Sequence, residues 1–149
     1  MDTTDIIRFV AACLFLCVIA VGIAYIAFIS GVLKKCSPQS RTMQPGMVWL
    51  LLIPLFNVVW NFLVVNAIAD SLSNEFRLRN LPVNEQKPGR SLGLAMAICG
   101  ACGIIPFVNL IAILPHFILW LIYWVKIAGY SRMLDGVPVT IGAPANPSF

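Results

Sequence analysis

The stretch that decides the fold is MVWLLLIPLFNVVWNFLVVNAIADSLSNEF, residues 47–76. It opens with roughly 20 apolar residues, enough to cross the ~30 Å hydrocarbon core of a bilayer. Polar side chains enter at Asn57, Asn61, Asn66 and Asp70, and the segment then continues as a charged amphipathic helix. Because Pro54 removes a backbone hydrogen bond, we expect a kink or a restarted helix there.

The composition of the whole chain agrees with a membrane protein. Of its 149 residues, 60% are hydrophobic and 11% are charged, and the mean hydropathy is +0.90. Soluble domains carry about 25% charged residues, so this chain is expected to lie in a lipid bilayer. The net charge of +4 then reflects orientation and attraction to anionic lipid, and no basic soluble face is present for nucleic acid.

The hydrophobic pattern predicts an all-α integral membrane protein with four transmembrane helices arranged as two hairpins. The second and fourth helices continue beyond the bilayer. The acidic N-terminus and the long apolar run behind it favour a retained helix over a cleaved signal. We expect one domain over residues 1–134, with spans at 6–33, 47–70, 91–108 and 110–128, and an extended Pro/Gly/Ala tail over 135–149 that is held by the bundle or by another subunit.

Two short stretches resemble each other. Residues 53–58 read IPLFNV and residues 105–110 read IPFVNL, so Pro106 and Asn109 match Pro54 and Asn57. This pattern is consistent with a weak internal repeat of helix pairs. The alternative is that Pro and Asn simply recur where membrane helices bend.

The distribution of basic residues predicts the orientation. With four spans, both termini lie on one side of the membrane, together with most of the Lys and Arg residues. The positive-inside rule then places both termini in the cytoplasm. Lys34 and Lys35 favour the opposite orientation.

The wording PGMVWLLLIPLFNVVWNFLVVNAIADSLSNEF at residues 45–76, with LIYWVKIAGYS at residues 121–131, resembles small multi-span bacterial membrane proteins that carry a domain of unknown function. The resemblance covers about residues 41–134. It implies a multi-span fold in a bacterial inner membrane and no particular activity.

The cysteines form two pairs at similar predicted depth. Cys13 and Cys17 lie one turn apart in the first span, and Cys99 and Cys102 form a CxxC in the third. If their faces meet, four thiols form a zinc, iron–sulfur or disulfide site; the alternative is that each is a small buried packing residue. Cys36, at the membrane edge, is either a plain loop thiol or an acylation site.

The polar residues inside the spans fall on two faces. At 100° per residue Asn57 and Asn61 share one face, and Asn66 and Asp70 share nearly the opposite one. We expect helix–helix hydrogen bonds from these residues, with an ion path or a lipid headgroup site as alternatives. Pro54, Pro106 and Asn109 belong to the same helix-packing set. We expect the single histidine, His116, to bond a neighbouring helix, because haem in a bundle usually needs two axial ligands.

Two further groups are expected at the surface of the bundle. Residues of the second helix end and the following loop are predicted to meet solvent, acidic lipid or a partner: Arg77, Arg79, Lys87 and Arg90. Trp120 and Trp124 form an aromatic face predicted to meet lipid or another subunit.

No phosphate-binding glycine loop, Ser/His/Asp set, HExxH motif or pair of intramembrane carboxylates is present, so an enzyme is not expected. The sequence favours a non-catalytic accessory or scaffold subunit of a membrane complex, or a self-assembling oligomer. Its partners are then lipid and other membrane subunits or copies of itself, without a cofactor. The alternatives are a small oligomeric channel or transporter, and a thiol-based metal or redox protein.

Overall fold

The computed structural model describes residues 2–138, apart from the side chains of Pro54 and Leu55. In this part of the chain the ordered elements are all helices, which confirms the predicted all-α class. Three of them, α1, α2 and α4, contain stretches long and apolar enough to cross a membrane. The predicted tail beyond residue 138 lies outside the described residues. The elements are α1 (Thr3–Lys35), the short 3₁₀ helix η1 (Pro45–Leu52), α2 (Pro54–Leu78), α3 (Arg90–Cys102) and α4 (Pro106–Asp135).

At Pro54 one helix ends and another begins, and the chain reverses direction. The chain ends η1 at Leu52 and starts α2 at Pro54, which confirms the predicted break. The indole N–H of Trp60 donates to the Met47 carbonyl at 2.8 Å, and the Thr42 hydroxyl donates to the Ala67 carbonyl at 2.9 Å. Residues 42–52 therefore run back along α2, and the predicted single span over 47–70 is wrong.

The reversal has a local cause. Proline disfavours the α conformation in the residue before it, and Ile53 adopts φ −84° and ψ 111°. Ile105, which precedes Pro106, has nearly the same backbone at φ −85° and ψ 117°. In both places the Asn three residues after the proline donates its backbone N–H to the isoleucine carbonyl at 2.8 Å. The two similar stretches thus make the same kind of helix start.

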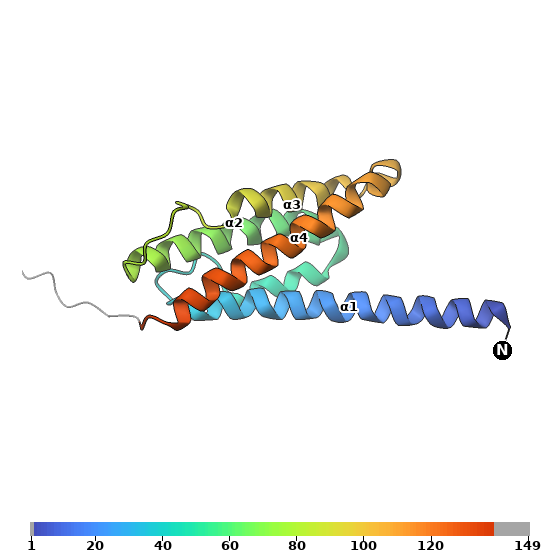
Figure 1. Ribbon diagram of the computed structural model, residues 1–149, viewed down its shortest axis with the longest axis horizontal. Coiled ribbons are helices and arrows are strands. Elements are labelled where there is room, and N and C mark those ends of the chain that lie inside the picture. The colour runs from blue at the N-terminus through green and yellow to red at the C-terminus, as the bar shows by residue number, and fades with distance from the viewer. Residues whose placement is uncertain (1, 139–149) are drawn as a thin grey trace, which may run out of the picture.

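The second reversal joins α3 to α4. α3 ends at Cys102, and α4 begins at Pro106 and continues through Pro115 to Asp135. These bounds replace the predicted spans 91–108 and 110–128, and α3 has only 13 residues. Figure 1 shows α3 and α4 running side by side, with their connecting turn at the end away from the C-terminus.

Close packing of α3 depends on Gly93. A Cβ added there would lie 2.5 Å from Val65 Cγ1 on α2 and 2.8 Å from Tyr123 Cε2 on α4. Only hydrogen leaves room for three helices to approach at this point. The core around it is made by the C-terminal half of α1 with η1, α2, α3 and α4, and its fully buried members include Ile29, Leu33, Val48, Ile68, Leu72, Met96, Tyr123 and Ile127.

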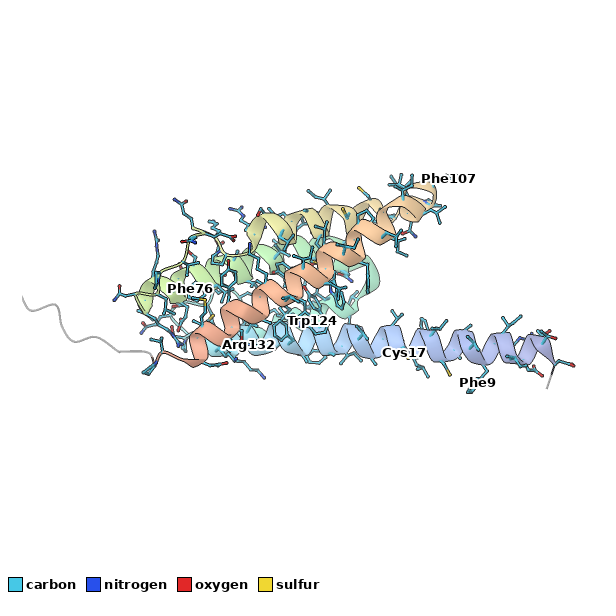
Figure 2. All side chains as sticks on the ribbon, viewed as in Figure 1. Phe9, Cys17, Phe76, Phe107, Trp124 and Arg132 are labelled. Carbon is cyan, nitrogen blue, oxygen red and sulfur yellow. The ribbon has the colours of Figure 1, made fainter. Side chains whose placement is uncertain are left out.

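α1 has two different halves. The first buried residue along it is Tyr25, and every described residue before Gly22 is exposed. Figure 1 shows this N-terminal half projecting beyond the rest of the bundle, and Figure 2 shows Phe9 and Cys17 on it. Its apolar surface has no partner within the described chain.

Charged groups gather at the opposite end of the bundle, near Phe76 and Arg132 in Figure 2. At the centre of this polar end is Glu75, which is fully buried. Its carboxylate accepts bonds from the Ser37 backbone N–H at 2.8 Å and hydroxyl at 2.7 Å, and from Arg79 Nε at 2.8 Å. Burial among these donors means that Glu75 is not part of a solvated helix face.

Arg79 extends this cluster to three helix ends. It donates to the Lys35 carbonyl at the end of α1 at 3.2 Å and to the Leu134 carbonyl near the end of α4 at 2.7 Å. Its side chain is 6% exposed, so the predicted surface contact at Arg79 is wrong. Lys35 adds an ion pair to Asp135 at 2.7 Å.

We predict that Arg79→Met destabilises the protein strongly. The change leaves the buried Glu75 carboxylate without its charge partner, and breaking a buried pair in this way costs about 3–5 kcal/mol. Unfolding in detergent, followed by circular dichroism during titration with dodecyl sulfate, measures the loss.

Arg77→Met is the matched control, because Arg77 is exposed on the same turn of α2. It should change stability by no more than about 0.5 kcal/mol. Equal stability of the two variants would show that the Glu75–Arg79 pair does not hold the helix ends together.

Candidate functional site

A groove opens where the projecting half of α1 leaves the bundle. Two adjoining cavities, of about 510 and 590 Å³, share Val18, Gly22, Tyr25, Asn57, His116 and Trp120. They form one continuous hollow, hereafter the groove, between α1, the η1–α2 turn and α4. A Cβ on Gly22 would meet nothing within 4 Å, so α1 makes no close contact at this wall.

The walls of the groove are apolar and aromatic. The rings of Tyr25 and Trp120 have centroids 5.3 Å apart, and those of Phe117 and Trp120 are 6.0 Å apart. Trp124 packs on Tyr25 and Phe28 at 5.7 and 5.9 Å. Trp120 and Trp124 are half-buried and join α4 to α1, rather than forming the free aromatic face that the sequence predicted.

Two amides face this hollow from α2. Asn57 and Asn61 lie one turn apart and both line the 510 Å³ cavity. Among the residues that the structure describes, neither side chain has a hydrogen-bond partner. The predicted helix–helix hydrogen bonds are therefore not made by this pair within the described residues.

The other polar face of α2 does make such contacts. Asn66 Oδ1 accepts from Arg90 Nε on α3 at 2.8 Å, and Asp70 pairs with Lys87 at 2.8 Å. The predicted separation of the four polar residues onto two faces thus corresponds to two different environments. Arg90 and Lys87, expected to meet lipid or a partner, are engaged within the chain.

His116 forms the third polar group of the groove. Its Nδ1 lies 3.1 Å from the Met96 carbonyl on α3. A carbonyl only accepts, so Nδ1 is the donor in this contact and Nε2 is the ring nitrogen not used in it. The ring fits because Gly100 lacks a Cβ, which would lie 3.1 Å from Cε1. The sequence predicted the bond to a neighbouring helix but not the position between two cavities.

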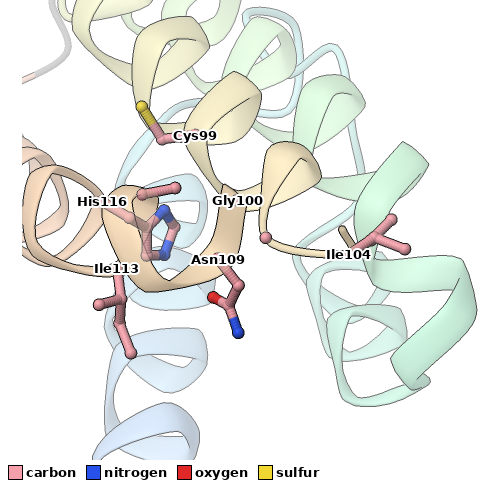
Figure 3. A pocket seen from close by; sticks show the side chains of 8 residues that line it. Cys99, Gly100, Ile104, Asn109, Ile113 and His116 are labelled. Atoms are coloured by element: carbon pink, nitrogen blue, oxygen red, sulfur yellow. The ribbon is translucent and has the colours of Figure 1, made fainter. Parts of the chain in front are cut away.

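The second cavity beside His116 is smaller, about 270 Å³, and lies between α3 and α4. Figure 3 shows Cys99, Gly100 and Asn109 around it. Asn109, at the first turn of α4, therefore faces a different hollow from Asn57, its counterpart at the first turn of α2.

The four thiols do not converge. Cys13 and Cys17 lie exposed on the projecting half of α1, while Cys99 and Cys102 are on α3. Within residues 2–138 no three His, Cys, Asp or Glu side chains are placed to hold a metal ion. The predicted four-cysteine site is wrong, because equal depth on two helices does not bring their faces together. His116 and Cys99 line a common cavity without a third ligand.

No protein-family model matches the chain, and the comparisons with curated proteins and with solved structures find no match either. The groove is therefore interpreted from its own geometry. It is an open, largely apolar, aromatic-walled hollow with polar side chains from α2 and α4.

Cys36 at the end of α1 is a buried thiol and not an accessible one. Its side chain is 1% exposed. Burial, with the nearby Glu75 charge as the second cause, raises the pKa of the Cys36 thiol from 9.0 to about 12. This reduces the thiolate fraction at neutral pH by about a thousandfold.

We predict that Cys36 in the folded protein is not labelled by N-ethylmaleimide at pH 7.5 and carries no acyl group. The thiolate is the reactive form, and both its fraction and its access are reduced. Peptide mapping by mass spectrometry, with the dodecyl sulfate-unfolded protein as reference, measures the labelling. Equal rates in the two states would contradict the buried position.

Proposed function

We propose that this chain is a non-catalytic integral membrane protein that acts as an assembly subunit and pairs with a second copy of itself through α1. One observation carries the proposal. Small residues occupy six positions of α1 spaced by four and three residues in turn: Cys13, Cys17, Ala20, Ala24, Ala27 and Gly31.

This small-residue face is free along its length. All six residues are exposed except Gly31, which is half-buried and would accept a Cβ without contact. At 100° per residue the face lies opposite Ile29 and Leu33, which pack into the core of the chain itself. The bundle therefore uses one side of α1 and leaves the other side unoccupied.

The spacing suits a parallel helix pair. Residues repeated every 3.5 positions keep two helices in contact along a left-handed supercoil, and small ones let the backbones approach closely in lipid. Two copies inserted with the same orientation bring identical residues to the same depth. A two-fold interface needs this self-complementarity.

We predict that oxidation with copper phenanthroline in native membranes converts the protein to a disulfide-linked dimer through Cys13 and Cys17. Close backbones put paired thiols within the ~7 Å Cα separation that a disulfide requires. Non-reducing gel electrophoresis measures the dimer.

Two comparisons make the result specific. Cys99→Ser with Cys102→Ser should still dimerise, whereas Ala20→Leu with Ala24→Leu should not, because leucine separates the backbones. Val21→Leu, exposed on another side of α1, is the size control. An unchanged yield of dimer in the Ala20→Leu, Ala24→Leu variant would refute the interface.

The orientation follows from where the charges gather. Lys35, Arg79 and Arg132 lie at the polar end of the bundle, and Arg8 shares the far end of α1 with Asp2 and Asp5. We propose that α1 crosses the membrane and that both hairpins enter and leave on the polar-end side. The positive-inside rule then places the polar end in the cytoplasm and the N-terminus outside. This differs from the orientation derived from four complete crossings.

The η1–α2 turn reaches the middle of the membrane in this arrangement. Leu51, Leu52 and Asn57 share the groove with Gly22 of α1. Gly22 is roughly 21 Å from Arg8 and roughly 18 Å from Lys34 at 1.5 Å per residue. Non-helical backbone at that depth is tolerated where it is packed on protein or lines a cavity, as it does here.

We predict opposite sides for the two ends. In a protein whose five cysteines are replaced by serine, a cysteine introduced by Thr4→Cys should react with a membrane-impermeant maleimide added outside intact cells. A cysteine introduced by Asn84→Cys should react only after permeabilisation. Reaction of both on the same side would refute the proposed orientation.

A further inference from the structure

The groove lies mainly on the inner side of α1, and of the small-residue face only Cys17 borders it. Pairing of two copies through that face therefore leaves the groove open. Its polar groups, Asn57 and His116, lie level with Cys17 to Gly22 of α1, near the middle of the proposed membrane span. The groove is thus a hollow in the bilayer interior whose amide groups have no partner in the described chain.

Unpaired amides in hydrocarbon are unfavourable, so an occupant with polar atoms is expected opposite them. Asn57 and Asn61 each offer N–H donors and a carbonyl acceptor, and His116 offers Nε2 as its second ring nitrogen. No Lys, Arg, Asp or Glu lines either cavity of the groove. These cavities therefore favour an occupant whose polar part is uncharged and carries acceptors for the amide N–H groups, for which ring oxygens are suited.

Depth and size exclude two other occupants. The charged headgroup of a phospholipid lies about 15 Å from the bilayer centre, too far to reach these amides. A helix about 10 Å wide fills roughly 400 Å³ with each 5.4 Å turn, so the two cavities of about 510 and 590 Å³ together hold less than about three turns, whereas a spanning helix of about 20 residues has more than five. A spanning helix of another protein does not fit in it, whereas a small molecule does.

The walls indicate the shape of that molecule. Tyr25, Phe117 and Trp120 present an aromatic surface beside the polar groups. Aromatic walls favour a flat ring by offset or edge contacts. We infer that the groove binds a neutral, lipid-soluble molecule with an oxygen-bearing ring, of the quinone class, whose ring oxygens meet Asn57 and Asn61 while its chain lies along α1 and α4.

The test uses the full-length protein in phosphatidylcholine nanodiscs with decylubiquinone as the probe. Quinones quench tryptophan fluorescence, and Trp120 lines the groove. We expect a saturable component of quenching above the linear background of quinone dissolved in the lipid. Quenching that stays linear over the whole range would overturn the inference.

The variant Asn57→Leu with Asn61→Leu should weaken the saturable component by roughly tenfold or more, because the ring oxygens lose their donors. Asn109→Leu is the matched control, since Asn109 begins α4 as Asn57 begins α2 but faces the smaller cavity. It should leave binding unchanged. Equal binding by the double variant and the wild type would refute the site.

Two further measurements fix the interpretation. 1-Decanol, which has the chain without the ring, should not displace the quinone; displacement would show that the groove takes any chain and would overturn the ring assignment. The double variant should unfold at the wild-type dodecyl sulfate concentration and still form the Cys13 cross-link. If the double variant does not fold, quinone binding is measured on Asn61→Leu alone. Unchanged binding by that variant would again refute the site.

Discussion

The buried contact between Glu75 and Arg79 joins the ends of α1, α2 and α4. One carboxylate and one guanidinium, both almost removed from solvent, join the last carbonyl of α1, the end of α4 and the loop that follows α1. A buried charge is tolerated only when it is paired and hydrogen-bonded. The helices that share this pair are therefore fixed to one another at the polar end, and the apolar ends diverge from there.

The two isoleucine–proline pairs, Ile53–Pro54 and Ile105–Pro106, set where the chain reverses direction. At Ile53 and at Ile105 the residue before proline is extended and the next helix starts at once, so the chain reverses twice with short turns. The outcome is one long helix beside two hairpins. Because the η1–α2 hairpin is short, it leaves the groove above its turn, and Asn57 at the start of α2 becomes part of that groove.

The sequence allowed some of this to be predicted. Pro54 predicted a break in the helix. The helical rotation of 100° per residue predicted that Asn57 and Asn61 lie on a different face of the helix from Asn66 and Asp70. An apolar run of 20 residues, however, looks the same whether it crosses a membrane or enters and turns back. Hydrophobic patterning also missed the buried Glu75, since a carboxylate near a helix end is usually solvated. The cysteine depths were predicted from residue counts, but the helix rotations that decide contact depend on tertiary packing.

The N-terminal half of α1 projects beyond the rest of the bundle, and this has a mechanical consequence. Phe9 to Leu33 of α1 is roughly 37 Å long, more than the ~30 Å of an average hydrocarbon core, so α1 would tilt to relieve hydrophobic mismatch if it crosses the membrane as proposed. With its base held by Lys35, tilting swings the free arm of α1 relative to α4. In the proposed arrangement, bilayer thickness would therefore affect the angle between the N-terminal half of α1 and α4.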